Sequence, residues 1–285
     1  MGTLTRDTFD IPLKARITLS HAHLQHLANV NKIDILHIKG YAFGAEVYRP
    51  GRTSTDADIL VRPAHVARFM HVLKDEGWQI LTTFESGSVF EHASTIYHPA
   101  WGLTDVHRYF PGLGYYHQKH AFDLLWDARR TKEIANFLCQ VPSLIDCRNI
   151  VVVHGARSSV RGIHPDVGYL LQKLDSQDWE AMRTRILEFD SEIAFDAALG
   201  EIDKHKDDRQ YLFWKSFADT LPAPTQWLGR LQRAEGWRMR AKIILKILMV
   251  NEDHLTMDLG HTPTRAEKWA LFFKRFERAY WWKKK

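Results

Sequence analysis

Apolar and polar residues alternate in the first third of the chain in the manner of β-strands. Residues 33–38 form a largely apolar run ended by a Lys-Gly pair, and residues 56–61 lead from two acids into an apolar stretch. Residues 102–110 alternate throughout, and residues 78–84 and 89–97 are further strand candidates. This pattern predicts a sheet in the N-terminal half.

Helical periodicity separates these strand candidates. Residues 13–30 place apolar side chains on one face of an amphipathic helix, which we expect to pack on the sheet. A short helix is predicted at residues 41–48. A longer one is predicted at residues 64–76, between Pro63 and Gly77. Helices and strands therefore mix in this half of the chain.

Helical spacing dominates from about residue 120 onward, where strand signals become scarce. Pro222 and Pro224 interrupt the pattern. Helices are predicted at residues 132–138, 149–158, 167–174, 179–189, 193–199, 228–250 and 265–282. The two halves predict an α+β fold, in which a small mixed-sheet domain over residues 1–118 precedes a mainly α-helical domain over residues 119–285.

Composition narrows the class of protein. With 285 residues, of which 45% are hydrophobic, the chain can bury a substantial core, so disorder and a fibre are both excluded. Cys139 and Cys147 are the two cysteines, and they form no Cys-x-x-Cys pair, so neither a disulfide framework nor a thiolate zinc site is expected. No segment approaches the roughly 20 apolar residues of a membrane span. We therefore expect a cytoplasmic protein without a transmembrane segment.

Asp56 and Asp58 lie two apart at the start of a predicted strand, so both carboxylates are expected to point to one face. Two such charges about 4 Å apart repel by roughly 4 kcal/mol at an effective dielectric constant of 20. A divalent cation relieves that repulsion, and Mg²⁺ leaves coordination positions for water and substrate phosphates. The alternative is a solvated strand edge that carries two acids.

A third acid favours the metal site. Asp105 lies on the alternating segment 102–110, with His107 on the same side of the strand. Adjacent strands are about 4.8 Å apart, so a strand next to the one with Asp56 and Asp58 would bring three carboxylates together. Three acids on two strands can hold two metal ions.

The motifs Lys39-Gly40, Arg52, Asp56-x-Asp58 and Asp105-Val-His107 occur in this order along the chain. In this respect the sequence resembles the uncharacterised nucleotidyltransferase family of the DNA polymerase β-like nucleotidyltransferase superfamily. That superfamily is marked by a strand ending in a Gly-rich turn, an Asp-x-Asp strand and a later single acid. In those enzymes the paired acids bind Mg²⁺, the third acid activates the attacking hydroxyl, and the turn holds the triphosphate.

The resemblance implies a role for each matching residue. Asp56 and Asp58 become ligands of two Mg²⁺ ions, or of Mn²⁺, and Asp105 becomes the catalytic base and an additional ligand. Gly40 becomes the phosphate-side turn. Tyr41 departs from the superfamily pattern, which has a second Gly or a Ser at this point.

Two basic residues could compensate for the bulky Tyr41 ring in the nucleotide site. Lys39 and Arg52 are predicted to meet phosphate oxygens. For Lys39 the alternative is a solvated residue at a strand end.

Residues 147–157 resemble the helix that follows the catalytic core in this family. His154 and Arg157 are three apart and share a helical face, so both are predicted to reach the nucleotide. Asp166 stands where the family has an acid at the beginning of the following helix. The alternatives are a buried, hydrogen-bonded His154 and an Asp166 favoured by the helix dipole.

Positive charge accumulates late in the chain, whose net charge is +5. A basic surface there could bind tRNA or another polyanion, or it could be a solvated helix face. An aromatic stripe accompanies the charges and is typical of core packing or a partner surface. The basic residues are Arg230, Arg233, Arg238, Arg240, Lys242, Lys246, Lys268, Lys274, Arg275, Arg278, Lys283, Lys284 and Lys285, and the aromatic ones are Trp269, Phe272, Phe273, Phe276 and Tyr280.

The resemblance implies an enzyme that transfers a nucleoside monophosphate, AMP in the first instance, from an NTP such as ATP to a hydroxyl and releases pyrophosphate. The acceptor stays open between a small molecule, a protein side chain and an RNA 3′ end. One alternative is a non-catalytic accessory protein on the same fold that binds a peptide or nucleic acid. Another is a tRNA-directed toxin, which the basic C-terminal region suggests.

Overall fold

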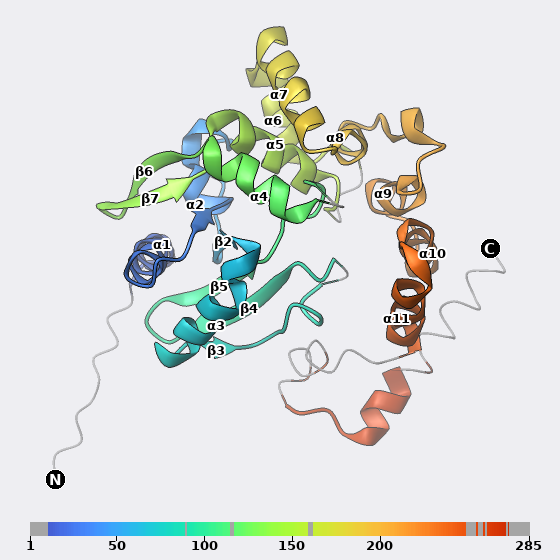
Figure 1. Ribbon diagram of the computed structural model, residues 1–285, viewed down its shortest axis with the longest axis horizontal. Coiled ribbons are helices and arrows are strands. Elements are labelled where there is room, and N and C mark those ends of the chain that lie inside the picture. The colour runs from blue at the N-terminus through green and yellow to red at the C-terminus, as the bar shows by residue number, and fades with distance from the viewer. Residues whose placement is uncertain are drawn as a thin grey trace.

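A mixed five-stranded sheet lies at the centre of the N-terminal half (Figure 1). Its spatial order is β1-β2-β5-β4-β3, with β2 and β5 parallel and the other neighbours antiparallel. The strands are β1 (Ile35–His37), β2 (Ala57–Val61), β3 (Gln79–Ile80), β4 (Ala93–His98) and β5 (Gly102–His107). The computed structural model describes residues 11–88, 90–114, 117–158, 162–248, 255, 259, 261–271 and 273.

The sheet has one face covered by the N-terminal helices. Helix α1 (Leu13–Val30) and helix α3 (Val66–Asp75) bury Ile35, Ile59 and Val106. Because side chains alternate along a strand, the neighbouring residues of β2 and β5 point to the opposite face, toward the helices of the second half. The predicted amphipathic helix at residues 13–30 is confirmed, and the predicted α+β fold is confirmed with it.

Helices form most of the second half, and α5 lies in the middle of its core (Figure 1). The helices predicted around residues 149–158, 167–174, 179–189 and 193–199 are confirmed with shifted ends. The helices of this half include α4 (Gln118–Asp127), α5 (Leu144–Gly155), α6 (Pro165–Lys173), α7 (Ser176–Glu188), α8 (Glu192–Ala198), the 3₁₀ turn η3 (Ile202–His205), α9 (Tyr211–Ala218), α10 (Ala223–Arg233) and α11 (Gly236–Leu248). Residues 265–271, the described beginning of the helix predicted at 265–282, are also helical.

A β-hairpin occupies the segment for which a helix at residues 132–138 was predicted, so that prediction is wrong. Strand β6 (Arg130–Ile134) pairs with β7 (Phe137–Val141). Between them Ala135 and Asn136 both have positive φ, +52° and +60°, as a two-residue type I′ turn requires. Burial also alternates along β7, which is a strand pattern.

The hairpin holds the turn that follows β1. Arg130 donates two hydrogen bonds to the carboxylate of Glu46, at 2.8 and 2.9 Å. Lys132 Nζ donates to the carbonyl oxygen of Phe43 at 2.9 Å and also pairs with Glu46. These contacts fix the short helix α2 (Gly40–Phe43) and the 3₁₀ turn η1 (Gly44–Glu46), which together form the predicted short helix.

Three other boundaries differ from the prediction. The helix expected over residues 228–250 is interrupted, because Ala234 is extended and Gly236 adopts φ of +74°. The strand predicted at 78–84 is limited to β3, and the one at 89–97 begins only at Ala93, after Glu91 with φ of +56°. Non-regular backbone at Ala234, Gly236 and Glu91 accounts for the helix break and for the late start of β4.

The C-terminal region is described only in part. Trp269 and Phe273 of the predicted aromatic stripe stack with ring centroids 5.8 Å apart. The rest of that stripe, Phe272, Phe276 and Tyr280, lies outside the described residues, as do Lys274, Arg275, Arg278 and the terminal lysines. In the described part of the chain, every helix is too short or too polar to cross a membrane.

Candidate functional site

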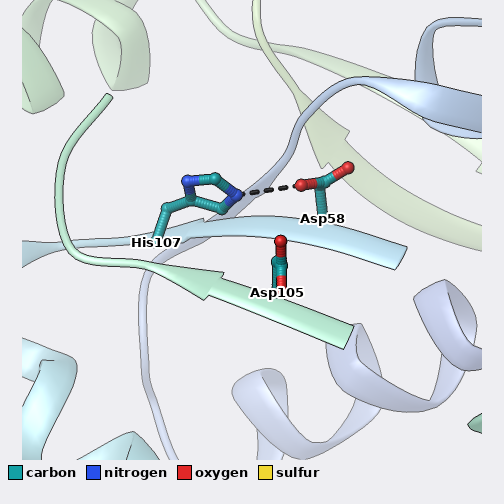
Figure 2. Close-up of side chains that lie close together, drawn as sticks. All are labelled: Asp58, Asp105 and His107. Atoms are coloured by element: carbon teal, nitrogen blue, oxygen red, sulfur yellow. Dashed lines mark hydrogen bonds and ion pairs between the residues drawn. The ribbon is translucent and has the colours of Figure 1, made fainter. Parts of the chain in front are cut away.

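Two acids face each other across the parallel strands β2 and β5. Asp58 and Asp105 are partners in the strand register, so the predicted adjacency of these strands is found. Figure 2 shows both carboxylates on the same side of the sheet, with His107 beside Asp58. Ligand atoms of Asp58, Asp105 and His107 all lie within 4.8 Å of one another. This is the face opposite α1.

Asp58 is held by two donors. His107 Nε2 lies 2.9 Å from Asp58 Oδ1, and because a carboxylate only accepts, the Nε2–H donates. Lys39 Nζ pairs with the same oxygen at 2.5 Å. The side chains of His107 and Lys39 are only 1% and 11% exposed. Lys39 therefore neutralises Asp58, a contact that the sequence did not predict.

Asp105 has a different environment. Its Oδ1 accepts a hydrogen bond of 2.7 Å from Thr95 Oγ1, which lies opposite it on β4. Burial, followed by the charge of Asp58, raises the pKa of Asp105 to about 6. A carboxylate with such a pKa is mostly ionised at neutral pH and still takes up a proton readily, as a general base must.

Asp56 lies outside this cluster. It stands in a bend immediately before β2, one residue outside the strand that carries Asp58. Its Oδ1 is 3.4 Å from Ser54 Oγ. Burial and then the charge of Asp58 raise the pKa of Asp56. Its role as a metal ligand stays a prediction.

The cluster fits a divalent cation. Asp58 and Asp105 offer carboxylate oxygens, the ligand type that Mg²⁺ and Mn²⁺ prefer. One lysine pairs with one of the two carboxylates, so the two together keep a net negative charge, and burial together with the charge of Asp58 raises the pKa of Asp105. A cation between the two carboxylates would remove that repulsion.

The turn after β1 brings backbone close to this cluster. Gly40 has φ of +47°, and a Cβ atom there would lie 2.8 Å from Ser54 Oγ. Lys39 adopts φ 59° and ψ −172°, a region that residues other than glycine rarely occupy. Such strain is typical of functional sites, and here it turns the Lys39 backbone just before Gly40.

The other predicted nucleotide contacts lie at different places around the turn. The Tyr41 ring packs against the core under α1, with Lys14 Nζ 5.8 Å from its centroid. Arg52 Nε donates to Asp166 Oδ2 at 3.0 Å, while the guanidinium lies 4.0 Å from the Tyr48 ring. Asp166, in the first turn of α6, therefore anchors the loop that leads to the acids.

His154 lies in the last turn of α5, and Arg157 lies in the turn that follows the helix. Arg157 Nη1 donates to His92 Nε2 at 3.0 Å, and the guanidinium lies against the Phe90 and Phe110 rings. Burial lowers the pKa of Arg157 to about 10. Burial, then the charge of Arg157, holds the pKa of His154 well below its usual value, so His154 is neutral. Their contact with a nucleotide stays a prediction.

Comparison with known proteins decides the family. The model of an uncharacterised nucleotidyltransferase family matches residues 15–201. The chain belongs to this family. It is accordingly a nucleotidyltransferase, and the match spans the whole sheet and the helices up to α8. No curated protein matches the sequence.

The solved structures that are similar in fold to this nucleotidyltransferase include the following three. The lincosamide antibiotic adenylyltransferase LnuA, bound to lincomycin, is 14% identical over 61% of this chain and 96% of its own, with a TM-score of 0.35. The antibiotic-resistance factor ANT(2'')-Ia is 12% identical over 69% and 96%, with a TM-score of 0.37. An antigenic nucleotidyltransferase-like protein from Paracoccidioides brasiliensis is 14% identical over 72% and 93%, with a TM-score of 0.34.

Replacing Gly40 by alanine in this nucleotidyltransferase should weaken NTP binding about tenfold and destabilise the fold by about 1–2 kcal/mol. The added methyl would be strained at positive φ and would collide with Ser54. Calorimetric NTP titration and chemical unfolding measure the two effects. Gly51→Ala is the matched control, since Gly51 also has positive φ but open space around it. Equal NTP affinity in both variants would contradict a role for the Gly40 turn.

Proposed function

We propose that this nucleotidyltransferase moves a nucleoside monophosphate, AMP in the first instance, from an NTP to a hydroxyl group in a Mg²⁺-dependent reaction. The observation that carries this proposal is the pairing of Asp58 with Asp105 across β2 and β5, in a chain that belongs to a nucleotidyltransferase family. The negative charge of these two facing carboxylates is only partly compensated, which suits the binding of a nucleoside triphosphate together with a divalent cation.

Asp105 is the proposed base. The acceptor oxygen forms a bond to the α-phosphorus while the bond from that phosphorus to the β-phosphate bridging oxygen breaks. The hydroxyl proton passes to Asp105, whose pKa of about 6 suits proton uptake at neutral pH, and pyrophosphate leaves. Bound Mg²⁺ or Mn²⁺, held by Asp58 and Asp105 and, as predicted, by Asp56, would neutralise charge on the phosphates.

Lys39 is proposed to change partner during binding. Its ammonium and a divalent cation would interact with the same carboxylate, that of Asp58. We expect Lys39 to exchange Asp58 for a phosphate oxygen once the cation neutralises that carboxylate. The Gly40 turn, Tyr41, Arg52, His154 and Arg157 remain the other proposed nucleotide contacts.

The acceptor is not identified by the basic helices. Arg230 of α10 and Lys242 and Lys246 of α11 all pair with Glu91, so an internal carboxylate already holds part of the predicted basic surface. This observation does not favour a polyanion over a small molecule or a protein as acceptor. The nucleotide half of the reaction is therefore tested first.

Calorimetric titration with each of the four NTPs, with and without Mg²⁺, tests the proposal. We expect wild-type protein to bind ATP most tightly, to lose binding in EDTA and to regain it with Mn²⁺. Asp58→Asn should lose metal-dependent binding. Absence of NTP binding by the wild type in the presence of Mg²⁺ would reject the proposed function.

A further inference from the structure

Three consecutive residues join the C-terminal helices to the acidic cluster. Phe90, Glu91 and His92 precede β4, and their side chains go to different partners. Phe90 packs on the aromatic side chains of α9, with ring centroids 5.4 Å from Phe213 and 5.0 Å from Phe217. Phe90 therefore attaches this segment to α9.

The Glu91 carboxylate pairs with basic side chains from both α10 and α11. This carboxylate, 15% exposed, pairs with Lys246 at 2.7 Å, Arg230 at 3.2 Å and Lys242 at 3.3 Å. Burial works to raise the pKa of Glu91, but the ion pairs with Lys246 and Lys242 outweigh it, so the net shift is downward. One ionised carboxylate thus binds cations from both helices.

The backbone of this segment is fixed as well. Glu91 has φ of +56°, a conformation that a residue with a side chain adopts only where its surroundings require it. Arg108 follows β5, and its Nε donates to the Glu91 carbonyl oxygen at 2.9 Å. The Arg108 backbone N–H donates to the His92 carbonyl oxygen at 2.9 Å. The reversal at Glu91 turns His92 back toward the sheet.

His92 carries the connection to the acids. Arg157 only donates, so His92 Nε2 accepts from it and the His92 Nδ1–H donates to Ser88 Oγ at 2.8 Å. The His92 ring lies 5.0 Å from the ring of His107. His107 in turn donates to Asp58, so the path from α11 to the carboxylate runs through the Lys246–Glu91 ion pair, the backbone from Glu91 to His92, and the His92 and His107 rings.

The helices at the far end of this path lie beyond the family match. That match ends at residue 201, whereas α9, α10 and α11 span residues 211–248. Figure 1 shows these three helices as a column at one side of the molecule. The Glu91 ion pairs tie that column to the strand next to β5.

We propose that Glu91 is a positioning residue, through which α10 and α11 hold His92 against His107 and thereby keep Asp58 oriented. The C-terminal helices are then part of the active site of this chain. The expected effect on kcat rests on the proposed function, whereas the placement of His92 against His107 does not depend on it.

The test compares Glu91→Gln and Lys246→Gln with the full-length wild type. Glu201→Gln and Lys204→Gln are the matched controls, because Glu201 also pairs with two cations, Arg183 and Lys204, but away from this path. The first readout is the side-chain ¹H–¹⁵N signals of His92 and His107 without metal or nucleotide. The second is kcat and KM for nucleotidyl transfer.

Glu91→Gln should shift both histidine signals and lower kcat about tenfold while KM for NTP changes less than about threefold. Lys246→Gln should do the same to a smaller extent and remains decisive if Glu91→Gln fails to fold. The controls should match the wild type. Unchanged histidine signals in the Glu91 and Lys246 variants, or an unchanged kcat, would overturn the proposal. If the wild type transfers no nucleotide, the proposed function fails and the histidine signals alone decide.

Discussion

Replacing Asp105 by asparagine is expected to abolish nucleotidyl transfer and, in metal-free protein, to stabilise the fold. Transfer should fall by about 10³-fold or more, because the variant lacks both the proposed base and a metal ligand. Stability should rise because burial and Asp58 disfavour the Asp105 charge in the folded state. Asparagine keeps an oxygen that can accept from Thr95. Because the variant is expected to stay folded, its loss of activity can be attributed to the missing carboxylate and not to unfolding.

The stability effect has a defined pH window. The pKa of Asp105 rises from 3.8 to about 6 on folding, so the folded state binds the proton more tightly than the unfolded state. The stability that this proton contributes is present below pH 3.8 and is lost as the pH rises through 6. Two pKa units correspond to about 3 kcal/mol, and relaxation of a real site reduces the expected gain to about 1–2 kcal/mol at pH 7.5.

Urea unfolding in EDTA at pH 7.5 and near pH 4 measures this effect. Asp105→Asn should be the more stable protein at pH 7.5, and its advantage over the wild type should disappear near pH 4. A variant that is less stable than the wild type at pH 7.5 would show that the Thr95 hydrogen bond and the Lys39 charge outweigh the repulsion from Asp58.

Strand periodicity was sufficient to predict that Asp105 and His107 lie on the same side of one strand. Side-chain direction along a strand is a local property, so the spacing of Asp105 and His107 placed both on one face before any long-range contact was known. The adjacency of this strand to the one carrying Asp58 was a condition of the predicted site, and the β2–β5 register meets that condition. The position of Asp56 outside β2 was not predicted, because the strand boundary at Ala57 depends on pairing with β1 and β5.

The hairpin was missed because its composition favours a helix. Residues 132–138 contain lysine, glutamate, alanine and leucine, all good helix formers, and space their apolar positions by three and four. Packing of β7 on α1 and β1 overrides that local preference. Asn136 was the one local signal, since asparagine tolerates the positive φ of the turn.

The contacts that surround the acids could not be predicted, because each joins segments far apart in sequence. Ser54 is recognised only by its approach to Gly40, and the partner of Arg52, Asp166, lies on a distant helix. Glu91 looks like an ordinary surface acid in a polar segment until α10 and α11 are placed against it. Pattern analysis gives the direction of a side chain but not its tertiary partner.

Asp58→Asn should abolish transfer as completely as Asp105→Asn, yet it should destabilise the fold. Asp58 accepts from His107 and neutralises Lys39, and both donors are almost fully buried. Removing one member of a buried ion pair leaves the other charge without compensation, which costs about 3 kcal/mol. The same chemical change at two facing carboxylates is therefore expected to alter stability in opposite directions.

Urea unfolding in EDTA at pH 7.5 tests this contrast, with Asp34→Asn as the control. Asp34 pairs with Arg62 near the surface, so its replacement should cost less than about 1 kcal/mol. The double variant Lys39→Met/Asp58→Asn should recover part of the stability that Asp58→Asn loses, because no buried ammonium is left unpaired. Equal stability of Asp58→Asn and the wild type would mean that water solvates the Lys39 ammonium in place of the carboxylate. In that case the lysine would not be held at the carboxylate, and its proposed exchange between Asp58 and a phosphate oxygen would lose its basis.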